Sequence, residues 1–263
     1  MRTFFYGMII GVANIIPGVS GGTMAVILNI YDKIISSISN LRTDFKNSLK
    51  FLIPLGLGSG IGILLFAKII DFCLENFASA TSLVFLGLIL GSIPMINKKA
   101  SEYNKTTSGY LCMAVAIIIL GFMHFSNIDD SSTLITTLSA GSFAKLFFAS
   151  FIAAGAMIIP GISGSFILLL LGIYSSILTA ISNFNILILI PVGLGCGVGI
   201  LVCAKIIDIL FKKYPQQTYM GILGLMIGSM IIIVPQFTAS FEFLIGCILC
   251  VVSAKIARDF SNK

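Results

Sequence analysis

The sequence predicts an all-α polytopic membrane protein built as an inverted repeat, each half holding one re-entrant helical hairpin and about three transmembrane helices. Two observations carry this prediction: the chain is very apolar, and its first half returns in its second half. Charged residues make up 10% of the chain and the mean hydropathy is +1.09, whereas soluble domains carry roughly 25% charged residues. The net charge of +6 therefore reflects orientation in a membrane, and we expect no nucleic-acid partner.

The duplication is clearest around a proline-glycine element. The string Ile-Ile-Pro-Gly-Val-Ser-Gly-Gly at residues 15–22 returns as Ile-Ile-Pro-Gly-Ile-Ser-Gly-Ser at 158–165. At a shift of 143, residues 11–40 match their copy at 14 of 30 positions, and at a shift of 137, residues 52–71 match at 15 of 20. Repeats of this kind are typical of transporter folds.

We therefore expect a single integral membrane domain made of two repeats, over residues 1–125 and 143–263. Within them, six apolar stretches reach the roughly 20 residues that span a bilayer core. They run near 51–72, 79–96, 108–125, 187–210, 217–235 and 241–257.

Two further apolar segments are interrupted by Pro-Gly and predict hairpins. A first arm of about 13 residues rises only about 20 Å, less than the ~30 Å core. Each hairpin would turn inside the membrane and leave on the side from which it entered. At the turn, its irregular backbone must be shielded by protein or line a cavity. The arms are 3–16 with 21–38, and 144–159 with 164–181.

The distribution of charge supports hairpins over single crossings. With hairpins, thirteen of the 16 Lys and Arg residues fall on one face, which the positive-inside rule assigns to the cytoplasm together with both termini. Two short full spans per element would give the same distribution. One hairpin plus three spans is an odd number of crossings, so the second repeat would be inserted upside down.

The two Pro-Gly elements are the candidate binding site. Proline removes a backbone donor and glycine permits unusual backbone conformations, so a helix N-terminus would lie inside the membrane, where Ser20 or Ser163 can cap it. Free N–H groups and a positive dipole end suit an anion, phosphate above all. The alternative is a structural helix break without a ligand. The candidate residues are Pro17, Gly18, Ser20, Gly21, Gly22, Thr23, Pro160, Gly161, Ser163, Gly164 and Ser165.

Lys68 and Lys205 are lysines inside long apolar spans, and an aspartate, Asp71 or Asp208, follows each three residues later. Intramembrane charges are costly, so each lysine is a candidate gate or headgroup contact. Alternatively, each snorkels to the interface and pairs with its aspartate. Asn14 lies beside the first hairpin and completes the candidate substrate-binding set. Repeated glycines at 56–62 and 193–199 predict close helix packing.

The sequence contains no paired carboxylates, Ser/His/Asp set or nucleotide-binding glycine loop, and no cysteine-histidine cluster with metal spacing. The ten acids, mostly in loops, leave little for general acid–base catalysis. We therefore expect no catalytic residues, no metal and no cofactor, and a protein that is not an enzyme.

Asn14 to Thr23 with Ile30-Tyr31, and Pro160 to Ser165 with Gly172-Ile-Tyr174, resemble a bacterial membrane family described as polyprenyl-phosphate transporters. The resemblance covers nearly the whole chain. It implies transfer of undecaprenyl phosphate, the lipid carrier of cell-wall precursors, from the outer to the cytoplasmic leaflet of the plasma membrane, with a proton or sodium ion as candidate coupling ion. The family often has an acid where this chain has Asn14 and a glycine where it has Asn29.

The resemblance and the residues together suggest a phosphate bound between the two turns while the prenyl tail stays among membrane lipids. Three other functions remain open. The first is secondary transport of a small water-soluble anion, which needs no lateral opening to lipid. The second is a membrane enzyme that releases phosphate from lipids, and the third is a role in assembly.

Overall fold

The structure is a computed structural model that describes residues 1–15, 20–104, 106–125, 134–135, 137–237 and 240–261. Within these residues the chain forms helices and no strand. The helices are α1 (Arg2–Ile15), α2 (Gly21–Ile27), α3 (Tyr31–Ser39), α4 (Phe45–Asn76), α5 (Ala78–Ser101), α6 (Thr107–Phe125), α7 (Ala140–Ile158), α8 (Gly164–Leu170), α9 (Tyr174–Ser182), α10 (Ile186–Lys213), α11 (Pro215–Ile233) and α12 (Phe241–Ser261).

The prediction of an all-α polytopic membrane protein is confirmed. In the described part of the chain, α4, α5, α7, α10 and α11 are long and apolar enough to cross a membrane. Helix α6 contributes a shorter apolar segment, Thr107–Met123. Helix α12 was predicted as a span but is not among these candidates, because charged residues lie at both of its ends, Glu242 at the start and Lys255, Arg258 and Asp259 near the end.

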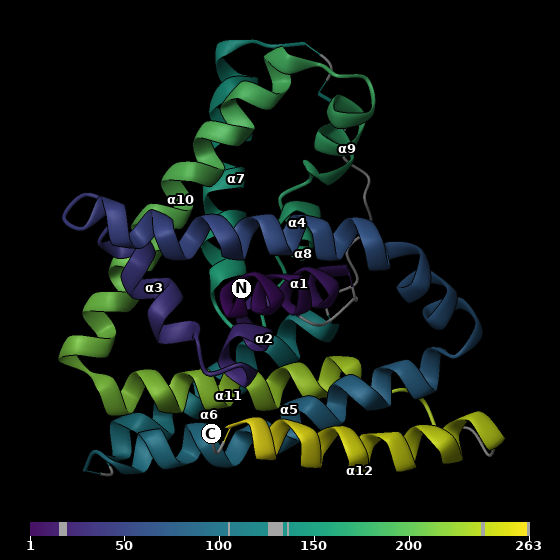
Figure 1. The fold of residues 1–263 in the computed structure, drawn as a ribbon. Coiled ribbons are helices and arrows are strands. Elements are labelled where there is room, and N and C mark those ends of the chain that lie inside the picture. The colour runs from purple at the N-terminus through teal and green to yellow at the C-terminus, as the bar shows by residue number, and fades with distance from the viewer. Residues whose placement is uncertain (16–19, 105, 126–133, 136, 238–239, 262–263) are drawn as a thin grey trace.

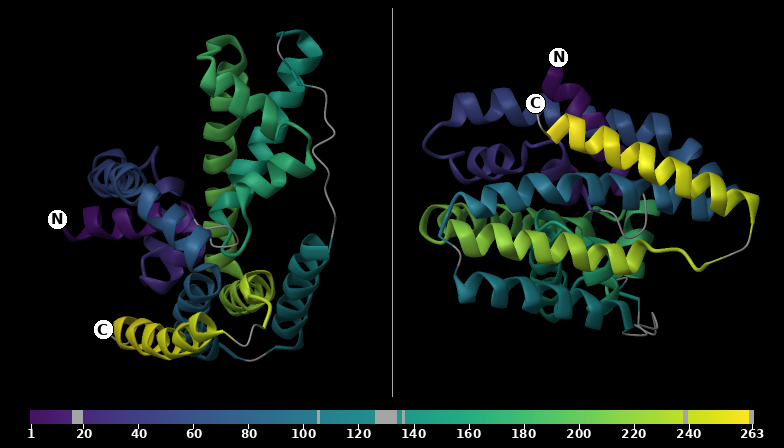
Figure 2. Two further views of the ribbon diagram at one scale, coloured as in Figure 1. Left: turned by 90° about the vertical axis from the view of Figure 1, so that its right-hand side faces the viewer. Right: turned by 90° about the horizontal axis from the view of Figure 1, so that it is seen from below.

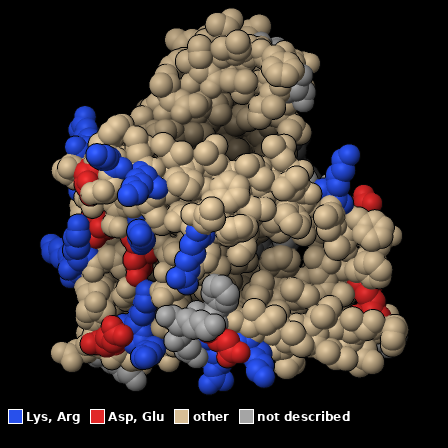
Figure 3. Space-filling view, viewed as in Figure 1, with Lys and Arg blue, Asp and Glu red and all other residues tan. Residues whose placement is uncertain are grey.

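The helices form a layered bundle with one projecting lobe. Helices α1, α4, α5, α6, α11 and α12 lie roughly side by side, whereas α7 and α10 rise steeply away from them and carry α9 (Figure 1, Figure 2). Lys and Arg side chains gather at one edge of the bundle, near α3, and the projecting lobe shows none in this view (Figure 3). In this view most of the charge thus lies at one edge of the bundle.

Equivalent helices of the two repeats make equivalent contacts. Helix α1 packs on α4 as α7 packs on α10, and α5 packs on α12 as α11 packs on α6. In each of the last two pairs, a helix of one repeat packs on a helix of the other. Helices α5 and α11 also pack together, and they run in opposite directions across the bundle (Figure 1).

Glycines explain why these pairs approach so closely. Gly58 and Gly62 of α4 lie against the backbone of α1, and Gly195 and Gly199 of α10 lie against the backbone of α7. A side chain at any of the four would collide with the neighbouring backbone. The prediction that these glycines serve helix packing is confirmed at these positions. The alternate glycines, Gly56, Gly60, Gly193 and Gly197, border open space instead.

The second arm of each hairpin differs from the prediction. Residues 21–38 and 164–181 were expected to form single helices, but each is broken after seven helical residues. At the break, Asn29 and Gly172 adopt positive φ angles of 56° and 65°. In each case the next N–H bonds the carbonyl five residues back, Ile30 to Ala25 and Ile173 to Leu168. This is the Schellman end of a helix, in which a residue in the left-handed region stops helix growth.

The first arms also differ from each other. Helix α1 has 14 residues and rises about 21 Å, which is less than the ~30 Å thickness of a bilayer core. Helix α7 has 19 residues and is long enough to cross. It begins at Ala140, earlier than predicted, because Ser139 and Ser142 form a reciprocal capping box at its start.

Candidate functional site: the meeting of the two turns

The two Pro-Gly elements contact each other directly. The backbone N–H of Gly161, in the second element, donates to Ser20 Oγ at 2.9 Å and to Thr23 Oγ1 at 2.8 Å, in the first. The two hydroxyl oxygens are themselves 3.0 Å apart and share a hydrogen bond. Residues 138 or more positions apart in the sequence thus form one polar cluster, and all of it is buried.

Local structure around Ser20 fixes this geometry. Ser20 is the N-cap of α2, and its Oγ accepts from the Thr23 N–H at 3.1 Å, as the sequence predicted for a capping serine. The cap places both hydroxyls on the same side of the helix start, facing Gly161. Ser163, the equivalent residue, makes no capping hydrogen bond with its side chain, so only the first element uses its serine in this way.

Glycine is required on both sides of the contact. Gly161 has φ of +83°, a left-handed conformation that side chains disfavour, and a Cβ there would lie 2.7 Å from the carbonyl oxygen of Leu225. A Cβ on Gly22 would lie 2.8 Å from the carbonyl oxygen of Ile158. The backbones of the two elements therefore approach within a distance that only small residues permit.

The two elements contribute different chemistry to the site. At the shift of 143, Asn14 corresponds to Met157, so the first element brings an amide where the second brings an apolar side chain. Asn14 lies beside Gly21, where an added Cβ would be 2.6 Å from Asn14 Oδ1. Asn14 and Met157 line the same cavity.

That cavity, of about 260 Å³, lies on the first element's side of the contact. Its lining is mostly apolar and includes Ile34 and Ile38 of α3, while Asn14 and Ser59 contribute polar side chains. Tyr31 also lines it and is itself buried.

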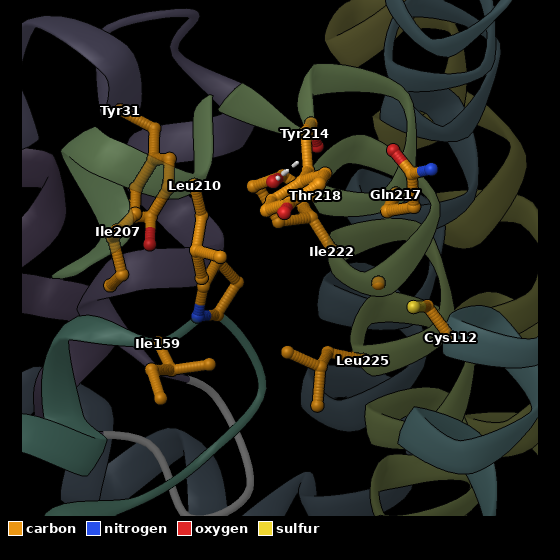
Figure 4. Close-up of a pocket in the computed structure, with 12 residues that line it drawn as sticks. Tyr31, Cys112, Ile159, Ile207, Leu210, Tyr214, Gln217, Thr218, Ile222 and Leu225 are labelled. Carbon is orange, nitrogen blue, oxygen red and sulfur yellow. Dashed lines mark hydrogen bonds between the residues drawn. The ribbon is translucent and has the colours of Figure 1, made fainter. Parts of the chain in front are cut away.

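A larger, apolar cavity of about 420 Å³ begins at the second element. Tyr31, Ile159, Ile207 and Leu210 lie on one side of it, and Cys112 with the α11 residues Thr218, Ile222 and Leu225 on the other (Figure 4). Pro160 forms part of its lining, directly before Gly161. Because Tyr31 lines both cavities, the polar cluster, the smaller cavity and the apolar cavity are neighbours.

The remaining candidate residues are placed as follows. Lys68 and Lys205 are exposed on the long helices α4 and α10, and neither lines the two cavities described above. Gly164 is buried against Ala153 and Met157 of α7. Pro17 and Gly18 lie outside the described residues, and the side chains of Ser165 and Asp71 are likewise not described.

Asp208 has partners other than the one the sequence suggested. Its carboxylate accepts from Ser39 at 3.0 Å and pairs with Lys212 at 2.8 Å, rather than with Lys205. These bonds tie α3 to α10. The i,i+3 spacing pointed to Lys205, but Lys212 at i+4 lies closer on the helix face.

Sequence reasoning also missed a second polar network behind α3. Asp32 pairs with Lys99 of α5 at 2.8 Å and accepts from the Tyr219 hydroxyl of α11 at 3.2 Å. The Lys99 ammonium lies 5.6 Å from the centre of the Tyr219 ring. The sequence offered no signal for this network, because its members lie up to 187 positions apart.

An apolar bundle of helices in which two similar Pro-Gly elements meet at a buried polar cluster is typical of the membrane transporter class. Comparison with known proteins gives the family: residues 10–245 match the undecaprenyl phosphate translocase-like family, and the chain belongs to it.

Two relatives support this assignment. The chain is 33% identical over 244 residues to the polyprenyl-phosphate transporter of Vibrio cholerae serotype O1, covering 88% of this chain and 76% of that protein. It is 33% identical over 272 residues to the polyprenyl-phosphate transporter of Staphylococcus aureus, covering 96% and 95%. No solved structure matches the chain.

Proposed function

We propose that this protein carries a polyprenyl phosphate, specifically undecaprenyl phosphate, across the bacterial plasma membrane and so returns the lipid carrier to the cytoplasmic leaflet. The family and both relatives support transport of a polyprenyl phosphate. The observation that carries the proposal is the placement of an apolar cavity beside a buried cluster of hydrogen-bonding groups. An amphiphile with a phosphate head and a hydrocarbon tail needs both.

The head would bind between the two elements. In this structure the Gly161 N–H and the hydroxyls of Ser20 and Thr23 form hydrogen bonds with one another. Of the two hydroxyl protons, one lies in the Ser20–Thr23 hydrogen bond and the other remains to be donated. A phosphate entering between the elements would replace the Gly161 contact and accept from this amide and both hydroxyls. Helices α2 and α8 have seven residues each, so these donors, rather than a helix dipole, would supply most of the attraction.

Asn14 would add a neutral donor from the smaller cavity. An acid in its place would repel a phosphate unless protonated, whereas an amide donates without a proton from solution. If a proton is coupled to transport, residue 14 does not carry it in this protein, because an amide side chain does not titrate.

The tail would lie in the apolar cavity, lined by residues such as Ile159, Leu210 and Leu225. This favours a lipid over a small water-soluble anion, because apolar walls give such an anion nothing to replace its hydration. The binding of a long tail also needs no enclosed site, since most of the prenyl chain can remain in the bilayer.

Movement of the head between leaflets would follow from the repeat. Helix α3 packs on α10 in this structure, whereas α9, its equivalent, has no comparable packing on α4 within the described residues. The two halves therefore differ in how this helix packs. If they exchanged these packing arrangements, the turns would become exposed to the opposite side of the membrane, as expected for inverted repeats with both termini in the cytoplasm.

The test is leaflet exchange in proteoliposomes that hold the purified protein. An impermeant reagent reports the headgroup from outside, for undecaprenyl phosphate, undecaprenol and inorganic phosphate, with and without imposed proton or sodium gradients. Faster exchange of the lipid phosphate alone supports the proposal. Transport of inorganic phosphate without exchange of the lipid would instead identify a small-anion carrier, and release of phosphate from the lipid would identify an enzyme.

A further inference from the structure

A basic cleft lies at the charged edge of the molecule, on the opposite side of α3 from the two turns. It consists of two hollows of about 460 and 300 Å³ that share Thr3, Lys33 and Phe51. We call these together the surface cleft. Its further polar lining residues are Arg2, Tyr6, Asn29, Ser36, Ser37, Asn40, Asp44, Asn47, Ser48 and Lys50.

The cations of the surface cleft lack acidic partners. Within the described part of the chain, Arg2, Lys33 and Lys50 form no ion pair, whereas Lys99 and Lys212 do. Arg2 donates to the Tyr6 hydroxyl at 2.8 Å, and the Lys33 ammonium lies 4.7 Å from the centre of the Phe51 ring. A cation held over an aromatic ring keeps its charge available to a ligand.

One acid lines the surface cleft, and an amide engages it. Asp44 accepts two hydrogen bonds from Asn47 Nδ2, at 2.9 and 3.1 Å. Three cations and one acid leave a surplus of two positive charges. The next residue to Lys33, Asp32, is paired on the far side of α3 with Lys99 and Tyr219, so it does not neutralise the cleft.

We infer that the surface cleft binds a phosphate dianion, the group that a phosphate monoester carries. A monoester has about −1.5 to −2 charges at pH 7, which the surplus charge matches, and the hydroxyls and amides of α3 and α4 add donors. A phosphodiester, the linkage of common bilayer phospholipids, has a single ionisable oxygen and would be held more weakly.

Helix α3 connects this cleft to the proposed transport site. Its Lys33, Ser36 and Ser37 line the surface cleft. Its Tyr31, Ile34 and Ile38 line the cavity that Asn14, Gly21 and Gly22 also line. A headgroup leaving that cavity at the charged edge would meet the surface cleft next. The cleft is thus a docking station for the phosphate of the transported lipid, an inference that rests on the proposed function.

The test is protection of Lys33 and Lys50 from an amine-acylating reagent, measured residue by residue by mass spectrometry on the detergent-solubilised protein. Geranylgeranyl phosphate at ten times its dissociation constant should slow acylation of both lysines about tenfold. Lys46 is the internal control, because it is exposed on α4, as Lys50 is, but does not line the cleft. Inorganic phosphate in place of the lipid distinguishes free phosphate from a lipid headgroup as the source.

Equal protection by phosphatidylglycerol, equal protection of Lys46, or no protection would overturn the inference. The Ser20→Ala/Thr23→Val variant should retain protection, because its changes lie in the turns. Lys33→Gln/Lys50→Gln should slow leaflet exchange, and Lys46→Gln should not. Exchange of the lipid by a protein whose Lys33 and Lys50 are never protected would refute the docking station alone. Protection without any lipid exchange would refute the proposed transport instead.

Discussion

The hydroxyl of Ser39 donates to the buried carboxylate of Asp208, 3.0 Å away, and this bond joins the end of α3 to α10. At the repeat shifts, Ser39 corresponds to Ser182 and Asp208 to Asp71, so the sequence holds the same pair of residue types in the other half. In the proposed transport cycle, the Ser39–Asp208 bond would hold α3 against α10.

Asp208→Asn should loosen α3 from α10. A hydrogen bond to a charged group contributes about 1.5–3 kcal/mol, so opening of α3 should become about tenfold or more frequent. Hydrogen exchange of the amides at residues 34–39 measures this. Asp44→Asn is the matched control, because Asp44 bonds Asn47 near the start of α4 rather than another helix of the bundle. Unchanged exchange in Asp208→Asn would show that the bond does not hold α3.

Gly161→Ala should destabilise the protein and stop transport. The left-handed backbone costs a side chain roughly 1–2 kcal/mol, and the Cβ would also press on the Leu225 carbonyl. Thermal unfolding in detergent and leaflet exchange measure the two effects. Gly193→Ala, in open space on α10, should be neutral or stabilising by up to about 1 kcal/mol. Equal behaviour of the two variants would contradict the assigned role of Gly161.

The sequence predicted that the helices are interrupted at the two Pro-Gly elements and that Ser20 caps a helix, because each feature leaves a local signal. It did not predict the breaks at Asn29 and Gly172. An asparagine inside an apolar helix pattern resembles an ordinary helical residue, although the aligned glycine was a visible hint. The bond from Gly161 to Ser20 and Thr23 could not be predicted, since tertiary packing alone brings the two turns together.

Gly221→Leu should impair transport by filling the apolar cavity. Gly221 lines this cavity and a Cβ there meets no neighbour, so the larger side chain can enter without disturbing the backbone. We expect the rate of undecaprenyl phosphate exchange to fall while Lys33 remains protected by inorganic phosphate. Gly197→Leu, on the open face of α10, should leave exchange intact. Full exchange by Gly221→Leu would mean that the tail lies elsewhere.

The central claim is that the phosphate binds where Ser20 and Thr23 meet Gly161. Ser20→Ala/Thr23→Val removes both hydroxyls with little change in volume, and Ser229→Ala removes a buried hydroxyl that bonds only within its own helix. The most direct measurement is leaflet exchange of undecaprenyl phosphate by these two variants in proteoliposomes. We predict at least about a tenfold loss in the double variant, equivalent to 1.4 kcal/mol of binding to the head, and none in Ser229→Ala. Wild-type exchange by a folded double variant would contradict the claim.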